Sequence, residues 1–325
     1  MQAHQVDVPE KAGMAEAGVM LGEPWAERLA ALASRLQTLP DKPEESAETT
    51  LRTLWLLACG ERLSPQLAMS RVLRVLSKAE TMELDRCIEQ RLAGSPLAHL
   101  TERQHFMGLE MLAGGEALIP RAETELLARA GVAALRAVAA GMTRAPLVID
   151  VCTGSGNVAA ALAHAVPEAR VHAADLSPEA VEFARCNMAH LGLQHRVKLY
   201  VGDLFSPFET DEFLGKVDVL TGNPPYISTG RLSSMPGEIV GHEPGLAFDG
   251  GPLGIRILQR IIREAPRYLR PGGWLAFEMG LGQGQAVIRR MSASGHFEQI
   301  EGLTDHNGEI RAVRARTRAA REDQE

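Results

Sequence analysis

The sequence predicts an α/β protein in which a doubly wound, mostly parallel sheet of seven strands follows an N-terminal helical domain. From residue 147 onward, short Val/Ile/Leu-rich segments alternate with helical patterns, as expected for a parallel sheet with helices on both faces. Before residue 94 the apolar residues recur at helical spacing instead. The length of 325 residues suits about two domains of roughly 100 to 200 residues each.

The N-terminal third is expected to contain a tail, a helical module and a hairpin. Residues 1–22 are small and polar without a pattern and predict an unstructured tail. Residues 23–103 form the helical module, in which the polar stretch 40–49 predicts a linker between two helical patterns. Residues 104–120 alternate around Gly114 and Gly115 and predict a linking β-hairpin that ends at Pro120.

The second domain is expected to span residues 121–316, with a C-terminal tail at 317–325. We predict its strands at 147–151, 170–174, 197–201, 217–221, 274–278, 296–303 and 309–316. We predict its helices at 158–165, 178–191, 254–269 and 284–293.

The charge, the cysteine spacing and the apolar runs of the chain argue against several classes of function. The chain carries 34 Lys and Arg against 41 Asp and Glu, and the formal net charge of -7 makes a nucleic-acid partner unexpected. The four cysteines lie far apart, so we expect no disulfide framework and no metal site. No apolar run approaches the length of about 18 residues that a membrane helix needs. We therefore expect a soluble, cytoplasmic protein without a membrane partner.

A glycine-rich turn follows the first strand of the predicted sheet. Thr153, Gly154 and Gly156 belong to a G-x-G-x-x-A pattern between strand and helix, which enzymes that bind dinucleotides share. Asp150 at the strand end would repel a pyrophosphate but attract S-adenosylmethionine, whose ammonium and sulfonium are both cationic. We therefore predict S-adenosylmethionine as cofactor; the alternative for Asp150 is a simple cap of the next helix.

Two more acidic residues follow the next two strands. Asp175 can accept hydrogen bonds from both ribose hydroxyls, with Leu176 beside it, unless it only caps the following helix. Asp203 can accept from the adenine amino group while Leu204 packs against the ring, unless it is an ordinary turn residue. Because the carboxyl ends of parallel strands share one edge of a sheet, the three acids together favour a cofactor site.

The fourth strand leads into Asn223, Pro224, Pro225 and Tyr226. The two prolines fix a turn whose carbonyl oxygens point outward, although a plain Pro-Pro turn is the alternative. A substrate NH2 group between the Asn223 side-chain oxygen and the Pro224 carbonyl would have both protons bound, and Tyr226 would cover one face of it. Since position 223 is not Asp, we predict direct in-line methyl transfer without a strong base, a covalent intermediate or a metal.

These motifs resemble those of the HemK-type protein-(glutamine-N5) methyltransferases, over residues 91–316. The resemblance also includes RLAGSPLAHLT at 91–101, LIPRAETE at 118–125, HEPGLAFDGG at 242–251, and Glu278-Met279-Gly280 with Gln283-Gly284. It implies a class I S-adenosylmethionine-dependent methyltransferase whose helical module binds the substrate. It implies that a peptide chain release factor is the partner, that the NPPY turn binds its glutamine amide, and that Arg121 and Glu123 close near the cofactor.

The chain differs from the family in its longer N-terminal module and in Pro252, Leu253 and Gly254 after Gly251. An alternative acceptor is therefore a small, amino-acid-like molecule, for example methionine methylated at sulfur. Methylation of an adenine or cytosine amino group in nucleic acid also uses NPPY-type turns, but the negative net charge disfavours it. A binding module without catalysis would need a damaged cofactor loop, and this loop is intact.

Overall fold

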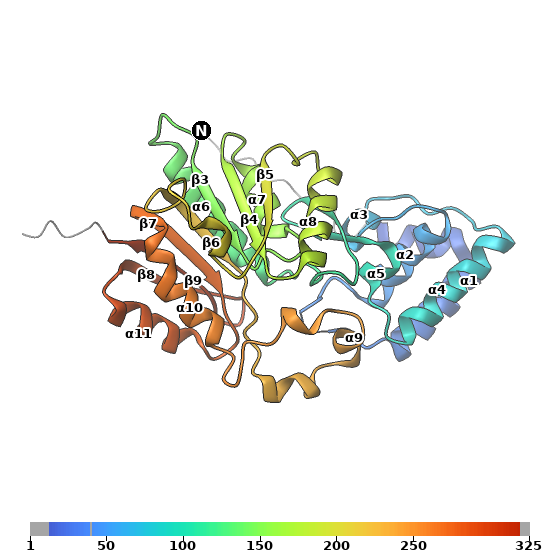
Figure 1. Ribbon diagram of the computed structural model, residues 1–325. Helices are drawn as coiled ribbons and strands as arrows, with labels where there is room; N and C mark the ends of the chain where they lie inside the picture. The colour runs from blue at the N-terminus through green and yellow to red at the C-terminus, as the bar shows by residue number, and fades with distance from the viewer. Residues whose placement is uncertain (1–12, 40, 319–325) are drawn as a thin grey trace, which may run out of the picture. The chain divides into compact units, whose positions relative to one another are not determined.

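The computed structural model describes residues 13–39 and 41–318 (Figure 1), so the predicted tail residues 1–12 and 319–325 lie outside the described residues. The chain divides into two compact units, Met1–Thr101 and Glu102–Glu325. Among the described residues, no helix is both long enough and apolar enough to cross a lipid bilayer.

The first unit is helical, as predicted. Its helices are α1 (Gly13–Arg35), α2 (Ala47–Ala58), α3 (Pro65–Ala68), α4 (Lys78–Leu92) and α5 (Leu97–Thr101). Serines at the N-caps of α2, α3 and α4 accept hydrogen bonds from the first turns, and Ser77 forms a reciprocal capping box with Glu80. The aromatic rings of Trp25 and Trp55 lie 5.6 Å apart in a core of leucines.

Two predictions for this unit differ from the structure. Helix α1 begins at Gly13, before the predicted boundary at residue 23, and Gly22 breaks its regular geometry at a φ of 60°. The predicted linker at 40–49 contains the N-cap of α2, and Glu45 is buried in an ion pair with Arg91 at 2.8 Å. A polar stretch can be packed in this way because its charge has a partner, which polarity alone does not reveal.

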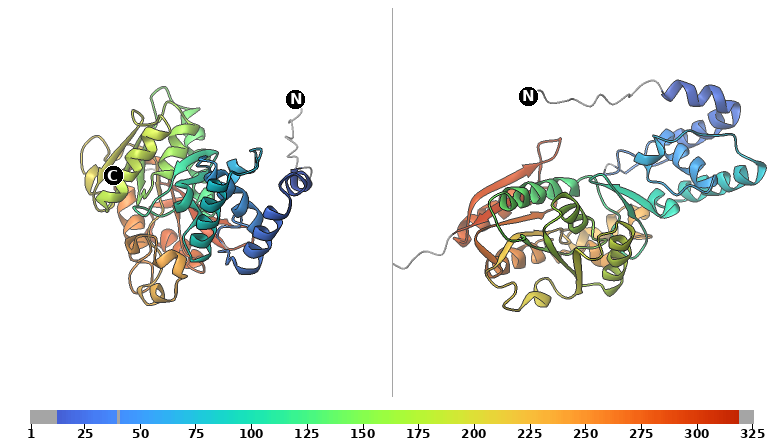
Figure 2. Two further views of the ribbon diagram at one scale, coloured as in Figure 1. Left: turned by 90° about the vertical axis from the view of Figure 1, so that its right-hand side faces the viewer. Right: turned by 90° about the horizontal axis from the view of Figure 1, so that it is seen from above.

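The second unit contains a seven-stranded sheet in the order β5-β4-β3-β6-β7-β9-β8. Its strands are β3 (Leu147–Val151), β4 (Arg170–Asp175), β5 (Val197–Val201), β6 (Val217–Gly222), β7 (Leu269–Glu278), β8 (Phe297–Thr304) and β9 (Ile310–Thr317). The first five are parallel to one another, and β9 pairs antiparallel with both β7 and β8. The last two strands, coloured red, lie side by side in Figure 2. The doubly wound, mostly parallel fold class is thus confirmed.

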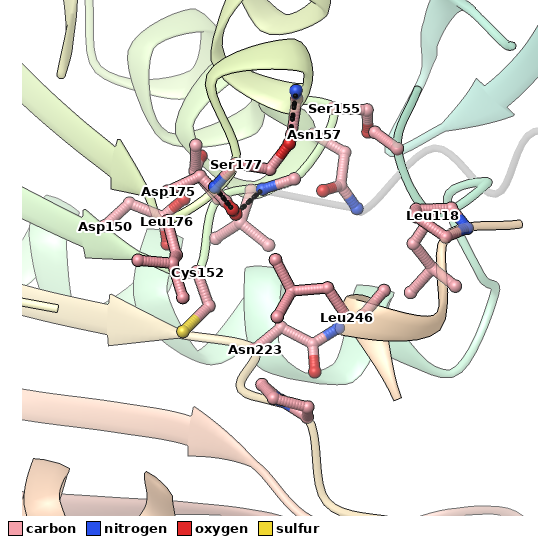
Figure 3. A pocket seen from close by; sticks show the side chains of 18 of the residues that line it. Leu118, Asp150, Cys152, Ser155, Asn157, Asp175, Leu176, Ser177, Asn223 and Leu246 are labelled. Atoms are coloured by element: carbon pink, nitrogen blue, oxygen red, sulfur yellow. Dashed lines mark hydrogen bonds between the residues drawn. The ribbon is translucent and has the colours of Figure 1, made fainter. Parts of the chain in front are cut away.

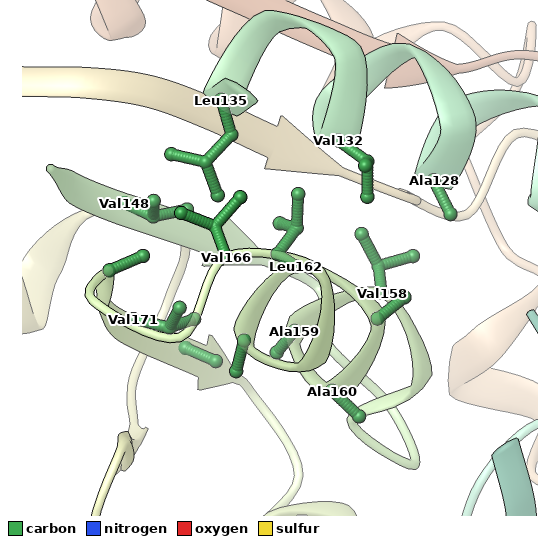
Figure 4. Close-up of a cluster of buried hydrophobic side chains, with 14 of the residues drawn as sticks. Ala128, Val132, Leu135, Val148, Val158, Ala159, Ala160, Leu162, Val166 and Val171 are labelled. Atoms are coloured by element: carbon green, nitrogen blue, oxygen red, sulfur yellow. The ribbon is translucent and has the colours of Figure 1, made fainter. Parts of the chain in front are cut away.

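Two hydrophobic clusters cover the two faces of this sheet. On one face, Val148 of β3 packs with Leu162 of α7 (Asn157–Ala165) and Leu135 of α6 (Thr124–Ala139), as Figure 4 shows. Helix α8 (Pro178–His190) contributes Met188 to the same cluster. On the other face, Ile149 belongs to a cluster with residues of α10 (Arg256–Glu264) and α11 (Gly284–Ser294). Alternation along β3 therefore directs successive side chains into opposite cores.

The predicted β-hairpin is present, but its turn was predicted at the wrong residues. Strands β1 (Arg103–Phe106) and β2 (Leu109–Leu112) are joined through Met107 and Gly108, whose φ angles are 51° and 83°. Such a two-residue turn with both φ positive suits a tight hairpin, whereas Gly114 and Gly115 follow the second strand. The hairpin packs into the core of the second unit, and Asn187 of α8 exchanges hydrogen bonds with the Leu112 backbone.

Candidate active site

A cavity lies at the carboxyl ends of β3, β4, β5 and β6 (Figure 3). Its lining includes these residues singled out from the sequence: Arg121, Asp150, Thr153, Gly154, Asp175, Leu176, Asp203, Leu204, Asn223 and Pro225. Parallel strands place their carboxyl ends at one edge, so residues that are distant in the sequence meet there. Gly156, Pro224, Tyr226 and Glu123 do not line this cavity.

Asp150 is buried at the end of β3, with 1% of its surface exposed. Its two carboxylate oxygens accept hydrogen bonds from the hydroxyls of Thr153 and Thr221, each at 2.6 Å. Burial raises the pKa of this carboxyl to about 6, while the two threonine hydroxyls and the Ala159 backbone act in the opposite direction. Asp150 is therefore more than a simple helix cap, because its side chain also braces the glycine-rich turn and the end of β6.

The glycine-rich turn needs its glycines for two different reasons. Gly154 has a φ of 53° and Gly156 a φ of 81°, a region that side chains disfavour. A Cβ atom at Gly156 would also lie 2.9 Å from the Met188 methyl group, so a larger residue cannot fit without a shift. The turn can thus approach a ligand with its backbone and pack closely against α8.

Asp175 links the glycine-rich turn to the end of β4. One carboxylate oxygen accepts the Gly154 N–H at 2.8 Å and the other accepts the Ser177 N–H at 3.0 Å. The N-cap of α8 is Ser177, whose hydroxyl accepts from Ala180. Burial raises the pKa of Asp175. The carboxylate is held at the cavity with lone pairs left to accept ligand hydroxyls.

Asp203 and Leu204 follow β5. Both oxygens of Asp203 accept from one guanidinium nitrogen of Arg260 in α10, at 2.8 and 2.9 Å. Leu204 is buried and has a positive φ of 52°. The partner Arg260 was not predicted, and it fixes the direction in which the half-exposed Asp203 carboxylate points.

The charges of the cavity fit S-adenosylmethionine. Among the described lining residues, the carboxylates outnumber the cations: Glu116, Asp150, Asp175, Asp203 and Asp249 stand against Arg121 and Arg256. Arg121 is itself paired with Glu243 and Asp203 with Arg260, which leaves four lining carboxylates against Arg256. The remaining field therefore favours a cationic ligand over a pyrophosphate. The buried Ser155 hydroxyl also lines the cavity and has no hydrogen-bond partner among the described residues, which leaves it available to a polar ligand group.

Asn223 follows β6 and lies beside the cavity (Figure 3). Its side-chain nitrogen donates to the Thr124 hydroxyl at 3.2 Å. The amide NH2 group is thus engaged by a neighbouring residue of the cavity lining, and the Oδ1 atom is left as an acceptor. Pro225 lines the cavity as well, whereas Pro224 can contribute only through its backbone.

Tyr226 and Glu123 lie in a second layer behind the cavity. The Tyr226 hydroxyl donates to Glu278 at 2.8 Å, so the structure does not place its ring along the cavity wall where the sequence placed it. Glu123 forms an ion pair with Arg311 of β9. The NPPY motif in the sequence predicts that all four residues face the substrate. The direction of each side chain, however, is determined by contacts with neighbouring elements.

Several polar residues were not predicted as site residues. Thr124 lines the cavity, and the others lie behind it: Thr221, Glu243, Arg260, Glu278 and Gln283. Thr124, Glu243, Glu278 and Gln283 occur in the segments that carry the family resemblance, which is the signal that could have found them. Thr221 and Arg260 belong to ordinary strand and helix patterns and give no such signal.

Comparisons with known proteins agree with this geometry. The model of the methyltransferase domain family matches residues 144–299. The release factor glutamine methyltransferase of Moorella thermoacetica is 38% identical over 275 residues, which cover 85% of this chain and 92% of that one. The Geobacter sulfurreducens enzyme of the same name is 34% identical, with 86% and 92% of the two chains covered.

Solved structures support the same fold at much lower identity. The hMettl16 catalytic domain in complex with the MAT2A 3'UTR hairpin 1 superposes with a TM-score of 0.52 at 15% identity, over 70% of this chain and 79% of that one. Identity and coverage of the enzymes from Moorella and Geobacter go much further than a shared fold. The chain therefore belongs to the release factor glutamine methyltransferase family and is an S-adenosylmethionine-dependent methyltransferase.

Proposed function

We propose that this enzyme transfers a methyl group to the side-chain amide nitrogen of a glutamine in a peptide chain release factor. The observation that carries the proposal is the orientation of Asn223, whose NH2 group is taken up by Thr124. An amide oxygen at the cavity accepts hydrogen bonds and suits a substrate that offers N–H groups. The relatives from Moorella and Geobacter bear the name of this activity.

The NPPY turn addresses the main chemical difficulty of this reaction. An amide nitrogen is a poor nucleophile, because its lone pair is delocalised into the carbonyl group. S-Adenosylmethionine supplies an electrophilic methyl group when it is bound. Oδ1 of Asn223 and the carbonyl of Pro224 would accept the two amide protons and hold the nitrogen in line with that methyl group. Such positioning can contribute about 7 to 11 kcal/mol in favourable cases.

The same acceptors select among substrates. A hydroxyl or thioether acceptor would leave at least one of the two oxygen atoms without a donor, which costs about 1 to 3 kcal/mol for a buried group. The five carboxylates around the cavity also disfavour the phosphate backbone of nucleic acid. We therefore favour a protein amide over a small molecule methylated at sulfur and over RNA. A release-factor substrate also supports a cytoplasmic location for the enzyme.

The test is a methyl-transfer assay with radiolabelled S-adenosylmethionine. Purified enzyme is incubated with a release factor, with the same release factor carrying Glu in place of the glutamine of its Gly-Gly-Gln loop, with free amino acids and with an RNA hairpin. We expect label in the unmodified release factor and none in the Glu variant. Label that enters only free amino acids or RNA would overturn the proposal while leaving the enzyme a methyltransferase.

A further inference from the structure

Asn187 of α8 is fully buried and joins two segments of the chain that are distant in sequence. Its Oδ1 atom accepts the backbone N–H of Leu112 at 2.7 Å, and its Nδ2 atom donates to the Leu112 carbonyl oxygen at 3.3 Å. The same Nδ2 atom also donates to the Ser155 carbonyl oxygen at 3.1 Å. The side-chain amide therefore uses both of its N–H donors, and it connects the end of β2 with the glycine-rich turn.

The backbone groups that Asn187 contacts need a partner from outside their own element. Ser155 precedes Gly156, the N-cap of α7, so its carbonyl oxygen does not belong to the hydrogen-bond ladder of that helix. Leu112 is the last residue of β2, and it turns both of its backbone groups towards α8. One asparagine thus supplies three hydrogen bonds that an apolar side chain of similar size could not supply.

The two joined segments line the same end of the cavity. The stretch after β2 contributes Glu116 and Leu118, and the glycine-rich turn contributes Ser155. Figure 3 shows Ser155 and Leu118 on one side of the cavity and Asp175 on the other. Asn187 is not among the described residues of the lining, so it acts on the cavity only through the segments that it holds.

This end of the cavity carries the polar groups that an amino acid needs. Ser155 is 2% exposed, and its hydroxyl, which has no hydrogen-bond partner among the described residues, can donate to a carboxylate. Glu116 on the other segment carries a negative charge that suits an ammonium group. With the ribose of S-adenosylmethionine at Asp175, as predicted, the amino-acid part of the cofactor extends towards this end.

We propose that Asn187 is a positioning residue, which holds the glycine-rich turn and the segment after β2 at the spacing that receives the amino-acid part of S-adenosylmethionine. The Ser155 hydroxyl then donates to the carboxylate of the cofactor. Without the Asn187 amide the two segments are no longer tied to each other, whereas Asp175 keeps its own hydrogen bonds to backbone N–H groups. The inference concerns cofactor binding and holds for any methyl acceptor.

Two ligands that differ in the amino-acid part alone test this role. S-Adenosylhomocysteine and methylthioadenosine share the adenosine and a neutral thioether sulfur, and only the former carries the amino acid. Isothermal titration gives the ratio of their dissociation constants. Asn187→Leu keeps the approximate size of the side chain without its hydrogen bonds. In this variant S-adenosylhomocysteine should bind at least about tenfold more weakly, while the affinity for methylthioadenosine should change by less than about threefold.

Two control variants separate this effect from a general loss of stability. Leu193 belongs to the hydrophobic cluster to which α8 contributes Met188, and it is not among the described residues of the cavity lining. Leu193→Ala should therefore lower the melting temperature without changing the ratio of the two dissociation constants. Asp175→Ala should weaken both ligands, since both carry the ribose. Equal weakening of both ligands in Asn187→Leu, or an unchanged affinity for S-adenosylhomocysteine, would overturn the proposal.

Ser155→Ala tests the same end of the cavity even where Asn187→Leu does not fold. It removes only the hydroxyl and leaves the backbone carbonyl that accepts from Asn187. It should weaken S-adenosylhomocysteine about threefold to tenfold and leave methylthioadenosine unaffected. Equal effects on the two ligands would refute the assignment of this end to the amino-acid part. These titrations contain no methyl acceptor, so their outcome and that of the release-factor assay are independent of each other.

Discussion

Arg121 and Glu243 form a buried ion pair across 122 positions of sequence. The other carboxylate oxygen of Glu243 accepts the backbone N–H of Ile119 at 3.0 Å. Leu118 and Arg121 line the cavity from one segment, and Pro244 and its successors line it from the other. The pair therefore ties together two stretches of chain that have no strand or long helix to hold them in place.

Breaking this ion pair from one side should destabilise the second unit. Arg121 is 8% and Glu243 6% exposed, so Glu243→Gln removes a buried negative charge that lies against the Arg121 guanidinium, at a cost of about 3 to 5 kcal/mol. Thermal and urea unfolding measure the loss in free energy of unfolding for Glu243→Gln, for Arg121→Met and for the double variant. The double variant should lose less than the sum of the two single losses; strict additivity would show that the two side chains are not coupled.

Substitutions of Asn223 in the NPPY turn and of Asp175 at the end of β4 should affect catalysis and cofactor binding separately. Asn223→Ala removes the proposed acceptor and should abolish turnover while largely sparing the affinity for S-adenosylmethionine. Asp175→Ala removes the carboxylate beside the glycine-rich turn and should weaken that affinity first. Isothermal titration with S-adenosylmethionine and steady-state kinetics distinguish the two outcomes. Parallel loss of binding and turnover in Asn223→Ala would contradict its assigned role.

Binding of S-adenosylmethionine should weaken in acid. The pKa of Asp150 in the free enzyme is raised to about 6, so the carboxylate is ionised at pH 8 and becomes neutral as the pH falls through 6. A neutral Asp150 no longer attracts a cationic ligand, and the dissociation constant should rise by up to about tenfold per pH unit below that point. Titrations between pH 5 and 8 check this. Asp150→Asn should bind weakly with a flatter pH dependence, to which the raised pKa of Asp175 still contributes.

Gln283 should be required for the shape of the turn. Its Nε2 donates to the carbonyl oxygens of Tyr226 at 3.0 Å and Gly254 at 3.2 Å, while its Oε1 accepts from the Gly280 N–H at 2.8 Å. Gln283→Glu is nearly isosteric but replaces the donor by an oxygen that faces both carbonyls, at a cost of about 1 to 3 kcal/mol. We expect a lower melting temperature and a lower kcat. Gln283→Met places no negatively charged oxygen against the two carbonyl oxygens, so we expect it to lower the melting temperature less than Gln283→Glu does.

The parallel sheet could be predicted closely from the sequence. The predicted bounds of β3 and β5 agree with the structure, and the predicted helix at 284–293 differs from α11 by one residue at its end. Strand β3 is a short apolar run that is buried at every position, and α11 buries Val287 and Met291 at helical spacing, so a local pattern reveals both elements. Helix α6 was not predicted by its bounds, although it packs against β6 and β7. Its sequence is rich in alanine, and alanines occur both on its buried face, as Ala128 and Ala134, and on its exposed face, as Ala133.

Part of the cavity lining could be predicted from the sequence, whereas the contacts behind it could not. Asp150, Asp175 and Asp203 stand at strand ends, where fold and chemistry together point to a cofactor. The hydrogen bond that holds the Asn223 side chain comes from Thr124, which lies 99 positions away. The position of the hairpin turn was predicted wrongly for a related reason. Both candidate turns contain glycine, and only the pairing of Phe106 with Leu109 decides between them. Such long-range partners leave no mark in a local pattern.

Strand β9 lies between β7 and β8 and carries Arg311, the partner of Glu123. On the ribosome, the nascent second unit can pair β3, β4, β5, β6 and β7 in turn, but β8 emerges before the strand that joins it to the sheet. The ionic cluster behind the NPPY turn can form only after residue 311 has left the exit tunnel. A nascent chain that ends at β7 therefore lacks both the partner of Glu123 and the strand that pairs with the free edge of β7.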